Sequence, residues 1–317
     1  MSEFRLTTPV VMIIFKKLDT TKRVFEKVRA AAPNKLYVIS DAPRKYVEGE
    51  DEKVQEVRKY IDSHIDWDCE VIRDYAEQNM GCGKRIASGL DRVFQNEEQA
   101  IILEDDCVPH DTFFRYCQEM LEHYKDDDRV LMIGGNNPVE QLYDTKEDYI
   151  FSRVPFMWGW ATWKRSWNLY DYKLSTWPQN RKNPLIAQAI PNKRARCFYT
   201  TEFEVLHQGK YDDVWDYQFM YVGIMNNMFG ILPSKSHVEN VGFVEDATHT
   251  YDMPDWINRN VTPVNFPIKY REDVIWDKTF DEIYMEKVTR QGYIVKLKQL
   301  LGLDINKSIF DSLKKRY

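Results

Sequence analysis

The stretch IILEDDCVP, residues 101–109, joins three strongly apolar residues directly to three adjacent carboxylates. The apolar residues predict the end of a strand that runs through the core. Glu104, Asp105 and Asp106 repel one another at neutral pH unless a cation or a proton compensates their charge. A core strand that ends in this way predicts a compensating partner opposite the three acids.

Apolar runs and amphipathic stretches alternate through the first half of the chain. Strands are predicted by the apolar runs at 10–15, 36–40, 69–72, 100–103 and 129–133. Between them, apolar residues recur at helical spacing: Val24 and Val28; Val54, Val57 and Ile61; Ile86, Leu90 and Val93; Phe113, Cys117 and Leu121. Because parallel strands need crossover helices, the alternation predicts an α/β fold with a mostly parallel sheet covered on both faces.

Charged residues follow several of these strands at the point where each ends. The strand ends read Phe15-Lys16-Lys17, Ser40-Asp41, Arg73-Asp74 and Glu104-Asp105-Asp106. Ligands of such sheets bind beyond the carboxyl ends of the strands, and carboxylate oxygens suit Mg²⁺ or Mn²⁺ that also holds a diphosphate. The pattern predicts a phosphate and metal site. The alternative is a solvated acidic turn before the helix that starts near His110 or Asp111.

Composition favours a protein that is neither secreted nor bound to nucleic acid. The chain has 317 residues, 43% of them hydrophobic and 30% charged, with a net charge of -6 and no dominant basic stripe. Its five cysteines are scattered without a CxxC pair, which predicts reduced thiols in the cytoplasm. No run of about 20 apolar residues predicts a membrane span. The C-terminal segment GYIVKLKQLLGLDINKSIFDSLKKRY, 292–317, is predicted to form either a surface helix or a basic amphipathic stretch for peripheral membrane contact.

The motif ILEDDCVPHDTFFRY, 102–116, resembles the metal-binding acidic motif of nucleotide-sugar glycosyltransferases of the GT-A fold. It is especially similar to N-acetylglucosaminyltransferase I and to bacterial family 2 enzymes of surface-polysaccharide synthesis. The resemblance extends in the same order through PVVMIIFKKLDTTKRVFEKV, VISDAPR, RDYAEQNMGCGKRIASGLDRVF, VPFMWGWATWKRSW and VWDYQFM, roughly residues 9 to 250. It implies a GT-A domain over 1–270, with a nucleotide-sugar-binding half at 1–140 and an acceptor half at 141–270, followed by a helical extension at 271–317.

The resemblance implies roles for individual residues on the donor side. Asp106 would coordinate Mn²⁺ or Mg²⁺, Glu104 and Asp105 would hold the ribose and the donor sugar, and Asp41 would read the base. Further nucleotide-sugar contacts are implied for Phe15, Lys17, Asn79, Gly81 and Lys84. The KKL that follows the first strand departs from the family, which usually has Asn-Arg-Pro or Asp-Arg there.

The pair Trp215-Asp216 occupies the place where N-acetylglucosaminyltransferase I carries its catalytic base. The resemblance therefore implies that Asp216 deprotonates the acceptor hydroxyl, with Asp213 as the second candidate. The alternative is a surface acid or helix cap. His249 lies where many GT-A enzymes complete the metal shell, and a structural loop histidine is the alternative there.

Tryptophans cluster at 158–167, and they either form core or stack on sugar rings. Trp158 and Trp160 are the residues most suited to stacking, and Trp215 joins them as an acceptor-side candidate. The function expected is an inverting, metal-dependent glycosyltransferase that uses a nucleotide-diphosphate sugar, with UDP as the favoured nucleotide, and a glycan or lipid-linked glycan acceptor.

Two other functions are kept as alternatives to glycosyl transfer. A sugar-phosphate nucleotidyltransferase would have a related scaffold, but its glycine-rich phosphate loop is missing from IIFKKLDTT, 13–21. A non-catalytic carbohydrate-binding protein would retain the aromatic cleft, but it would have no need for both the acidic trio and a placed base.

Overall fold

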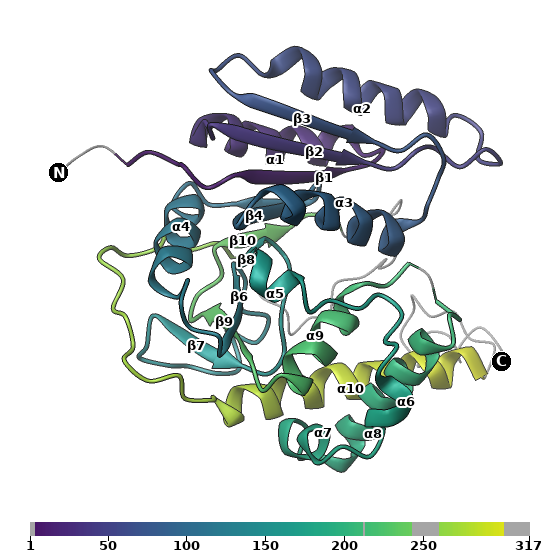
Figure 1. Ribbon diagram of the computed structural model, residues 1–317, viewed down its shortest axis with the longest axis vertical. Coiled ribbons are helices and arrows are strands. Elements are labelled where there is room, and N and C mark those ends of the chain that lie inside the picture. Colours follow the sequence, from purple (N-terminus) through teal and green to yellow (C-terminus); the bar gives the residue numbers. More distant parts are fainter. Residues whose placement is uncertain (1–3, 212, 243–259, 301–317) are drawn as a thin grey trace, which may run out of the picture.

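One mixed β-sheet organises the computed structural model, which describes residues 4–211, 213–242 and 260–300. In the described part of the chain its strands follow the order β3-β2-β1-β4-β8-β6-β9-β7 (Figure 1). Their bounds are β1 (Val10–Ile14), β2 (Lys35–Ser40), β3 (Glu70–Tyr75), β4 (Gln99–Glu104), β6 (Val130–Gly134), β7 (Tyr149–Ser152), β8 (Trp160–Trp163) and β9 (Phe229–Pro233).

The parallel half of the sheet confirms the predicted α/β fold. β3, β2, β1 and β4 are mutually parallel, and each of the five predicted strands is present. The connecting helices are α1 (Leu18–Ala31), α2 (Glu50–His64), α3 (Cys82–Asn96) and α4 (Phe113–His123).

Side chains of β1 alternate between two hydrophobic clusters, one on each face of the sheet. Val10 and Met12 pack with the apolar stripes of α1, α2 and α4. Val11 and Ile13 pack with α3 and with α9 (Asp216–Met225). This alternation is the period of two that a strand imposes, and it buries both faces as the sequence predicts.

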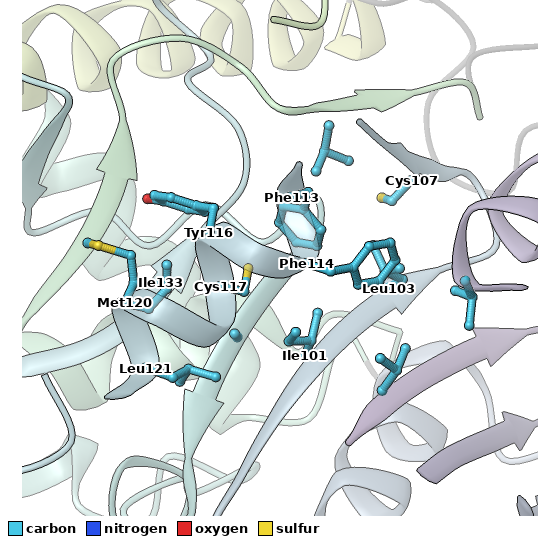
Figure 2. Packing of buried hydrophobic residues seen from close by; sticks show 14 of the residues in the cluster. Ile101, Leu103, Cys107, Phe113, Phe114, Tyr116, Cys117, Met120, Leu121 and Ile133 are labelled. Carbon is cyan, nitrogen blue, oxygen red and sulfur yellow. The ribbon is translucent and has the colours of Figure 1, made fainter. Parts of the chain in front are cut away.

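Helix α4 holds the segment after the acidic trio against the sheet. Figure 2 shows Phe114 and Cys117 of this helix among Ile101 and Leu103 of β4, and all four side chains are fully or almost fully buried. Cys107, also buried, starts the short strand β5 (Cys107–Pro109), which pairs with β10 (Val238–Asn240). Glu104 therefore ends β4, and Asp105 and Asp106 form a short turn between two ordered strands.

The sequence pattern does not predict β7, β8 or β9 of this sheet, and the strand among them that positions the site is β8. It runs antiparallel between β4 and β6, at the centre of the sheet. Trp160 and Trp163 are consequently buried, one on each face. Because β8 is antiparallel, it begins at the edge where β4 ends, and Trp160 pairs with Ile102. The two residues before β8 are thereby brought beside Glu104.

Helices α6, α7, α8 and α10 from the second half of the chain lie below the sheet in Figure 1, where α10 is yellow, and the short helix α5 lies next to β8. The bounds are α5 (Lys164–Trp167), α6 (Trp177–Asn180), α7 (Pro184–Ala189), α8 (Lys193–His207) and α10 (Lys278–Leu300). Phe280 of α10 is buried in a cluster with Val139, Ile150 and Leu232, so this helix is packed against the sheet. The boundary proposed at residue 270 stays a prediction.

None of the helices in the described ranges is long and apolar enough to cross a membrane. The C-terminal segment, for which the sequence leaves membrane contact open, lies mostly outside the described side chains. The five cysteines are free thiols, as the sequence predicts.

His237 provides a test of this packing through pH. Its ring is 5% exposed, packs edge-on against Tyr116, and donates from Nδ1 to the carbonyl of Thr262 over 2.7 Å. Burial lowers the pKa of His237 from 6.5 to about 4. Between these values the unfolded chain binds a proton that the folded protein does not, so stability is lost as the pH falls.

We expect the wild-type protein to lose roughly 3 kcal/mol more unfolding free energy than His237→Gln between pH 6.5 and 4. Urea unfolding at a series of pH values measures both proteins. His64→Gln, at an exposed site on α2, serves as the control and retains the wild-type slope. Equal slopes for the wild type and His237→Gln would show that the ring is accessible to protons.

Candidate active site

The carboxyl ends of β1, β2 and β4 surround a cavity of about 740 Å³, here called the strand-end cavity. It lies at the edge of the sheet where the sequence predicts a ligand. The structure brings together here every residue expected on the donor side, together with Asp106 and Trp158: Phe15, Lys17, Asp41, Asn79, Gly81, Lys84, Glu104 and Asp105. Their roles stay proposals, but their convergence is a property of the fold.

Burial and mutual repulsion act on the acidic trio as its sequence suggests. Burial, followed by the charges of Asp106 and Asp105, raises the pKa of Glu104 well above its ordinary value. Burial and the charge of Asp106 likewise raise the pKa of Asp105 to about 7. The Asp105 carboxylate accepts the backbone N–H of Phe15 over 2.9 Å, which ties the trio to the end of β1. The backbone thus holds three mutually repelling acidic side chains close together.

Lys17 is the cation that lies opposite the trio. Its Nζ is 3.9 Å from Asp106 Oδ2 and 3.5 Å from the carbonyl oxygen of Gly242. A Cβ on Gly242 would lie 2.1 Å from Asp106 Oδ2, so only glycine permits this approach of the backbone to the carboxylate. Lys17, Asp106 and Gly242 therefore form one packed unit.

Asp41 uses its carboxylate to hold a turn. Its two oxygens accept the backbone N–H groups of Ala42 (2.8 Å), Met80 (3.0 Å) and Gly81 (3.0 Å) and the side-chain amide of Asn79 (3.0 Å). A carboxylate offers about four acceptor positions, and these donors occupy them. Asp41 thus shapes the turn before α3, and the role in reading a base that the resemblance implies for it stays a prediction.

Two further cations line the cavity: Lys16, which belongs to the predicted strand end at 15–17, and Arg44, which no sequence pattern singles out. Both pair with Glu50, which is 1% exposed, through Lys16 Nζ at 2.8 Å and Arg44 Nε at 2.9 Å. The Arg44 guanidinium, above all, holds the pKa of Glu50 at about 2. Glu50 lies four positions before Val54, where the helical spacing begins. Nothing in the sequence indicates that this acid anchors the loop that carries Arg44.

A second cavity, of about 110 Å³, lies on the other side of Glu104 and is here called the aromatic cavity. Glu104 and Trp158 line both cavities. The remaining wall consists of Val154, Pro155, Phe156, Met157, Tyr199, Trp215, Asp216, Tyr217, Met220 and Tyr284. In the described part of the chain, the charged residues that line it are both acids.

Trp160 does not line either cavity and is a correction to our expectation that it stacks on a sugar. It is 1% exposed, with its ring 5.7 Å from that of Trp215 and packed against Trp167 and Phe219. The physical reason is its place on the central strand β8, whose side chains point into the helical layers. Trp158, two residues earlier, lies before the strand begins and does reach the cavities.

The two candidate bases are separated between the cavities. Asp216, exposed at the first residue of α9, lines the aromatic cavity, whereas Asp213 lines the strand-end cavity. The pKa of the Cys82 thiol is raised well above its ordinary value, first by burial and then by the charges of Glu104, Asp213 and Asp216.

The acidic trio provides part of the ligand set that a divalent cation requires. Among the described residues no group of three His, Cys, Asp or Glu side chains is arranged to hold a metal. Mg²⁺ and Mn²⁺ sites for nucleotides, however, use one or two carboxylates and complete the shell with phosphate and water. Asp106, with Glu104 beside it, fits that incomplete set. His249, the other expected ligand, lies outside the described residues.

The sequence matches no protein-family model and no curated protein. Solved structures with a similar course of the chain include a UDP-glucose pyrophosphorylase complexed with UDP-glucose, which is 10% identical, with a TM-score of 0.37 over 74% of this chain and 93% of that one. Mannosyltransferase PcManGT from Pyrobaculum calidifontis, in complex with GDP-Man and Mn²⁺, is 12% identical, with a TM-score of 0.36 over 71% and 70%.

The inositol-1-phosphate CTP transferase from T. maritima is 9% identical, with a TM-score of 0.36 over 73% of this chain and 86% of that one. By name, these structures are a pyrophosphorylase, a mannosyltransferase and a CTP transferase, so enzymes that transfer nucleotidyl groups and glycosyl groups both occur among them. The similarity concerns an α/β architecture shared with transferases that use nucleotides or nucleotide sugars. Since every TM-score is below 0.5, it does not distinguish between the two reactions.

Asp41→Asn tests the turn before α3. The substitution turns an NH₂ group toward backbone N–H donors, so we expect a loss of about 1–3 kcal/mol in unfolding free energy and weaker binding of nucleotides. Urea unfolding and calorimetry measure the two effects. Asp144→Asn, at an exposed loop position, should change neither. Wild-type behaviour of Asp41→Asn would contradict the assigned hydrogen bonds.

Proposed function

We propose that the protein transfers a sugar from a nucleotide-diphosphate sugar to a hydroxyl group of a glycan or lipid-linked glycan, with inversion, in surface-polysaccharide synthesis. The observation that carries the proposal is the meeting of two cavities at Glu104 and Trp158, one lined by cations and carboxylates together and the other aromatic and acidic. Such a pair suits a charged donor and a neutral acceptor. The preference for UDP rests on the family resemblance.

The donor side of the proposal rests on the strand-end cavity. Lys16, Lys17, Arg44 and Lys84 line it and would attract a diphosphate. Asp106 and Glu104 would hold Mn²⁺ or Mg²⁺, which when bound supplies positive charge where the leaving diphosphate develops negative charge. A cation at this place would also relieve the repulsion within the trio.

On the acceptor side, Asp216 would accept the proton of the attacking hydroxyl. The acceptor oxygen forms a bond to the anomeric carbon as the bond from that carbon to the diphosphate breaks, and the nucleoside diphosphate leaves with the electron pair. A single base is sufficient for this in-line reaction. Support comes from the position of Asp216 at the aromatic cavity, beside the carboxylate that lines both cavities.

Nucleotidyl transfer to a sugar phosphate is the second candidate, favoured by the names of two of the similar structures. Its second substrate is an anion. The described residues that line the aromatic cavity offer an anion two carboxylates, Glu104 and Asp216, and no cation. The segment after β1 also has no glycine-rich loop. Both observations support glycosyl transfer over this candidate.

Asp216→Asn tests the base. We expect release of UDP from UDP-sugars, with methyl glycosides as acceptors, to fall by about 10² or more, while the affinity for UDP is unchanged because Asp216 does not line the strand-end cavity. The matched variant Asp213→Asn should retain the larger part of the rate. The reverse order would assign the base to Asp213. Release of diphosphate from UTP and sugar 1-phosphates would instead support nucleotidyl transfer.

Asp106→Asn tests the metal assignment. Calorimetric titration with UDP, GDP, CDP and dTDP, each with and without Mn²⁺, is expected to show selective, metal-dependent binding by the wild type. Asp106→Asn should lose the metal dependence because one charged oxygen donor is replaced by an amide. Asp111→Asn, at an exposed site beyond β5, is the control. Unchanged Mn²⁺-dependent affinity in Asp106→Asn would remove this residue from the site, and no nucleotide binding at all would favour a carbohydrate-binding protein.

A further inference from the structure

We infer that the C-terminal helix α10 forms part of the acceptor site, that Tyr284 on it selects an uncharged sugar acceptor, and that Asp281 positions Tyr284. This inference rests on the proposed glycosyl transfer and names the acceptor class. It also assigns α10 to the acceptor site, although the domain prediction puts this helix in an extension, 271–317, beyond the catalytic domain.

Tyrosines from three different helices meet in the wall of the aromatic cavity. Tyr199 belongs to α8, Tyr217 to α9 and Tyr284 to α10. Tyr284 packs edge-on against Phe156 with ring centroids 5.9 Å apart, and Phe156 packs against Trp158 at 4.8 Å. A chain of ring contacts therefore connects α10 to the tryptophan that lines both cavities.

The buried carboxylate of Asp281 connects the two sides of the aromatic cavity. Asp281, one turn before Tyr284, is 1% exposed and accepts the indole N–H of Trp276 (2.6 Å), the backbone N–H of Arg153 (2.8 Å) and the hydroxyl of Ser152. Ser152 ends β7, and the segment that follows it, 154–158, forms the opposite side of the cavity. Asp281 thus fixes the distance between that segment and α10.

The charges around the cavity decide which acceptors it admits. Asp216 supplies negative charge at the start of α9, Glu104 adds a second acidic side chain, and no Lys, Arg or His is among the described lining residues. Burial, the largest cause, and nearby carboxylates raise the pKa values of Tyr199, Tyr217 and Tyr284, so their hydroxyls keep their protons and can donate.

An uncharged sugar suits this combination of groups. Its hydroxyls can donate to the carboxylates and accept from the phenols, and its apolar face can pack on the rings. A phosphorylated or carboxylated acceptor would face uncompensated repulsion, which costs several kcal/mol at partly buried sites. The cavity therefore favours neutral acceptors both by attraction and by exclusion.

The probes for the experiment are methyl β-glucoside, methyl β-galactoside, methyl N-acetyl-β-glucosaminide and glucose 6-phosphate. Saturation-transfer NMR measures their binding to the intact protein, alone and with UDP and Mn²⁺, and calorimetry measures the affinity for UDP. We expect at least one methyl glycoside to bind, and glucose 6-phosphate to bind at least tenfold more weakly.

Four variants separate recognition from folding. Tyr284→Ala should weaken glycoside binding about tenfold, and Tyr284→Phe, which retains the ring, about fivefold, the loss of one hydrogen bond. Asp281→Asn should weaken glycoside binding at unchanged UDP affinity, a split that general loss of structure would not produce. Tyr293→Phe, at a 44% exposed site on the same helix, is the control and should behave as the wild type.

The inference is overturned if no methyl glycoside binds, if glucose 6-phosphate binds as tightly as the glycosides, or if the Tyr284 variants bind glycosides as the wild type does. Failure of the proposed function gives a different pattern. In that case UDP does not bind, with or without Mn²⁺, while the glycosides still bind in a manner that depends on Tyr284.

Discussion

Backbone pairing between β4 and β8 is the contact on which both cavities depend. β4 carries the acidic trio out of the core, and β8 starts where β4 ends because the two strands are antiparallel. Their register sets Trp158 beside Glu104, and these two residues then line the cavities on both sides. A parallel strand at this position would instead have placed its carboxyl end beside the acids.

Gly159 makes this junction sterically possible. It has a φ of +66°, and a Cβ there would lie 2.7 Å from Val238. Its carbonyl accepts the backbone N–H of Gly135 over 2.7 Å, which ties the start of β8 to the end of β6. Trp158 and Trp160 therefore differ in role although they are two residues apart: the glycine separates a residue at the cavity from one in the core.

Charge balance at the sheet edge comes from elements that are distant in sequence. Lys17 approaches Asp106, while Glu50 collects Lys16 and Arg44 from two loops. The strand-end cavity is therefore lined by cations and carboxylates together. The aromatic cavity is acidic in contrast, so the edge of the sheet presents regions of different charge on the two sides of Glu104.

Local patterns in the sequence determine the first half of the fold and the position of its ligand edge. The runs that become β1, β2 and β4 are apolar on both sides, and the helices between them have single apolar stripes, so period and order are sufficient to predict a parallel sheet and to group Lys17, Asp41 and Glu104 at its edge.

Only the tertiary structure decided what these groups contact. The Asp41 carboxylate accepts hydrogen bonds from a turn almost forty residues later in the chain. Trp160 is buried because it lies on a central strand that is too short to show a clear alternation. Tyr284 lines the aromatic cavity from α10, which Asp281 connects to the segment after β7. Such contacts join segments far apart in the chain. Their geometry depends on strand order and helix packing, which no local pattern of residues encodes.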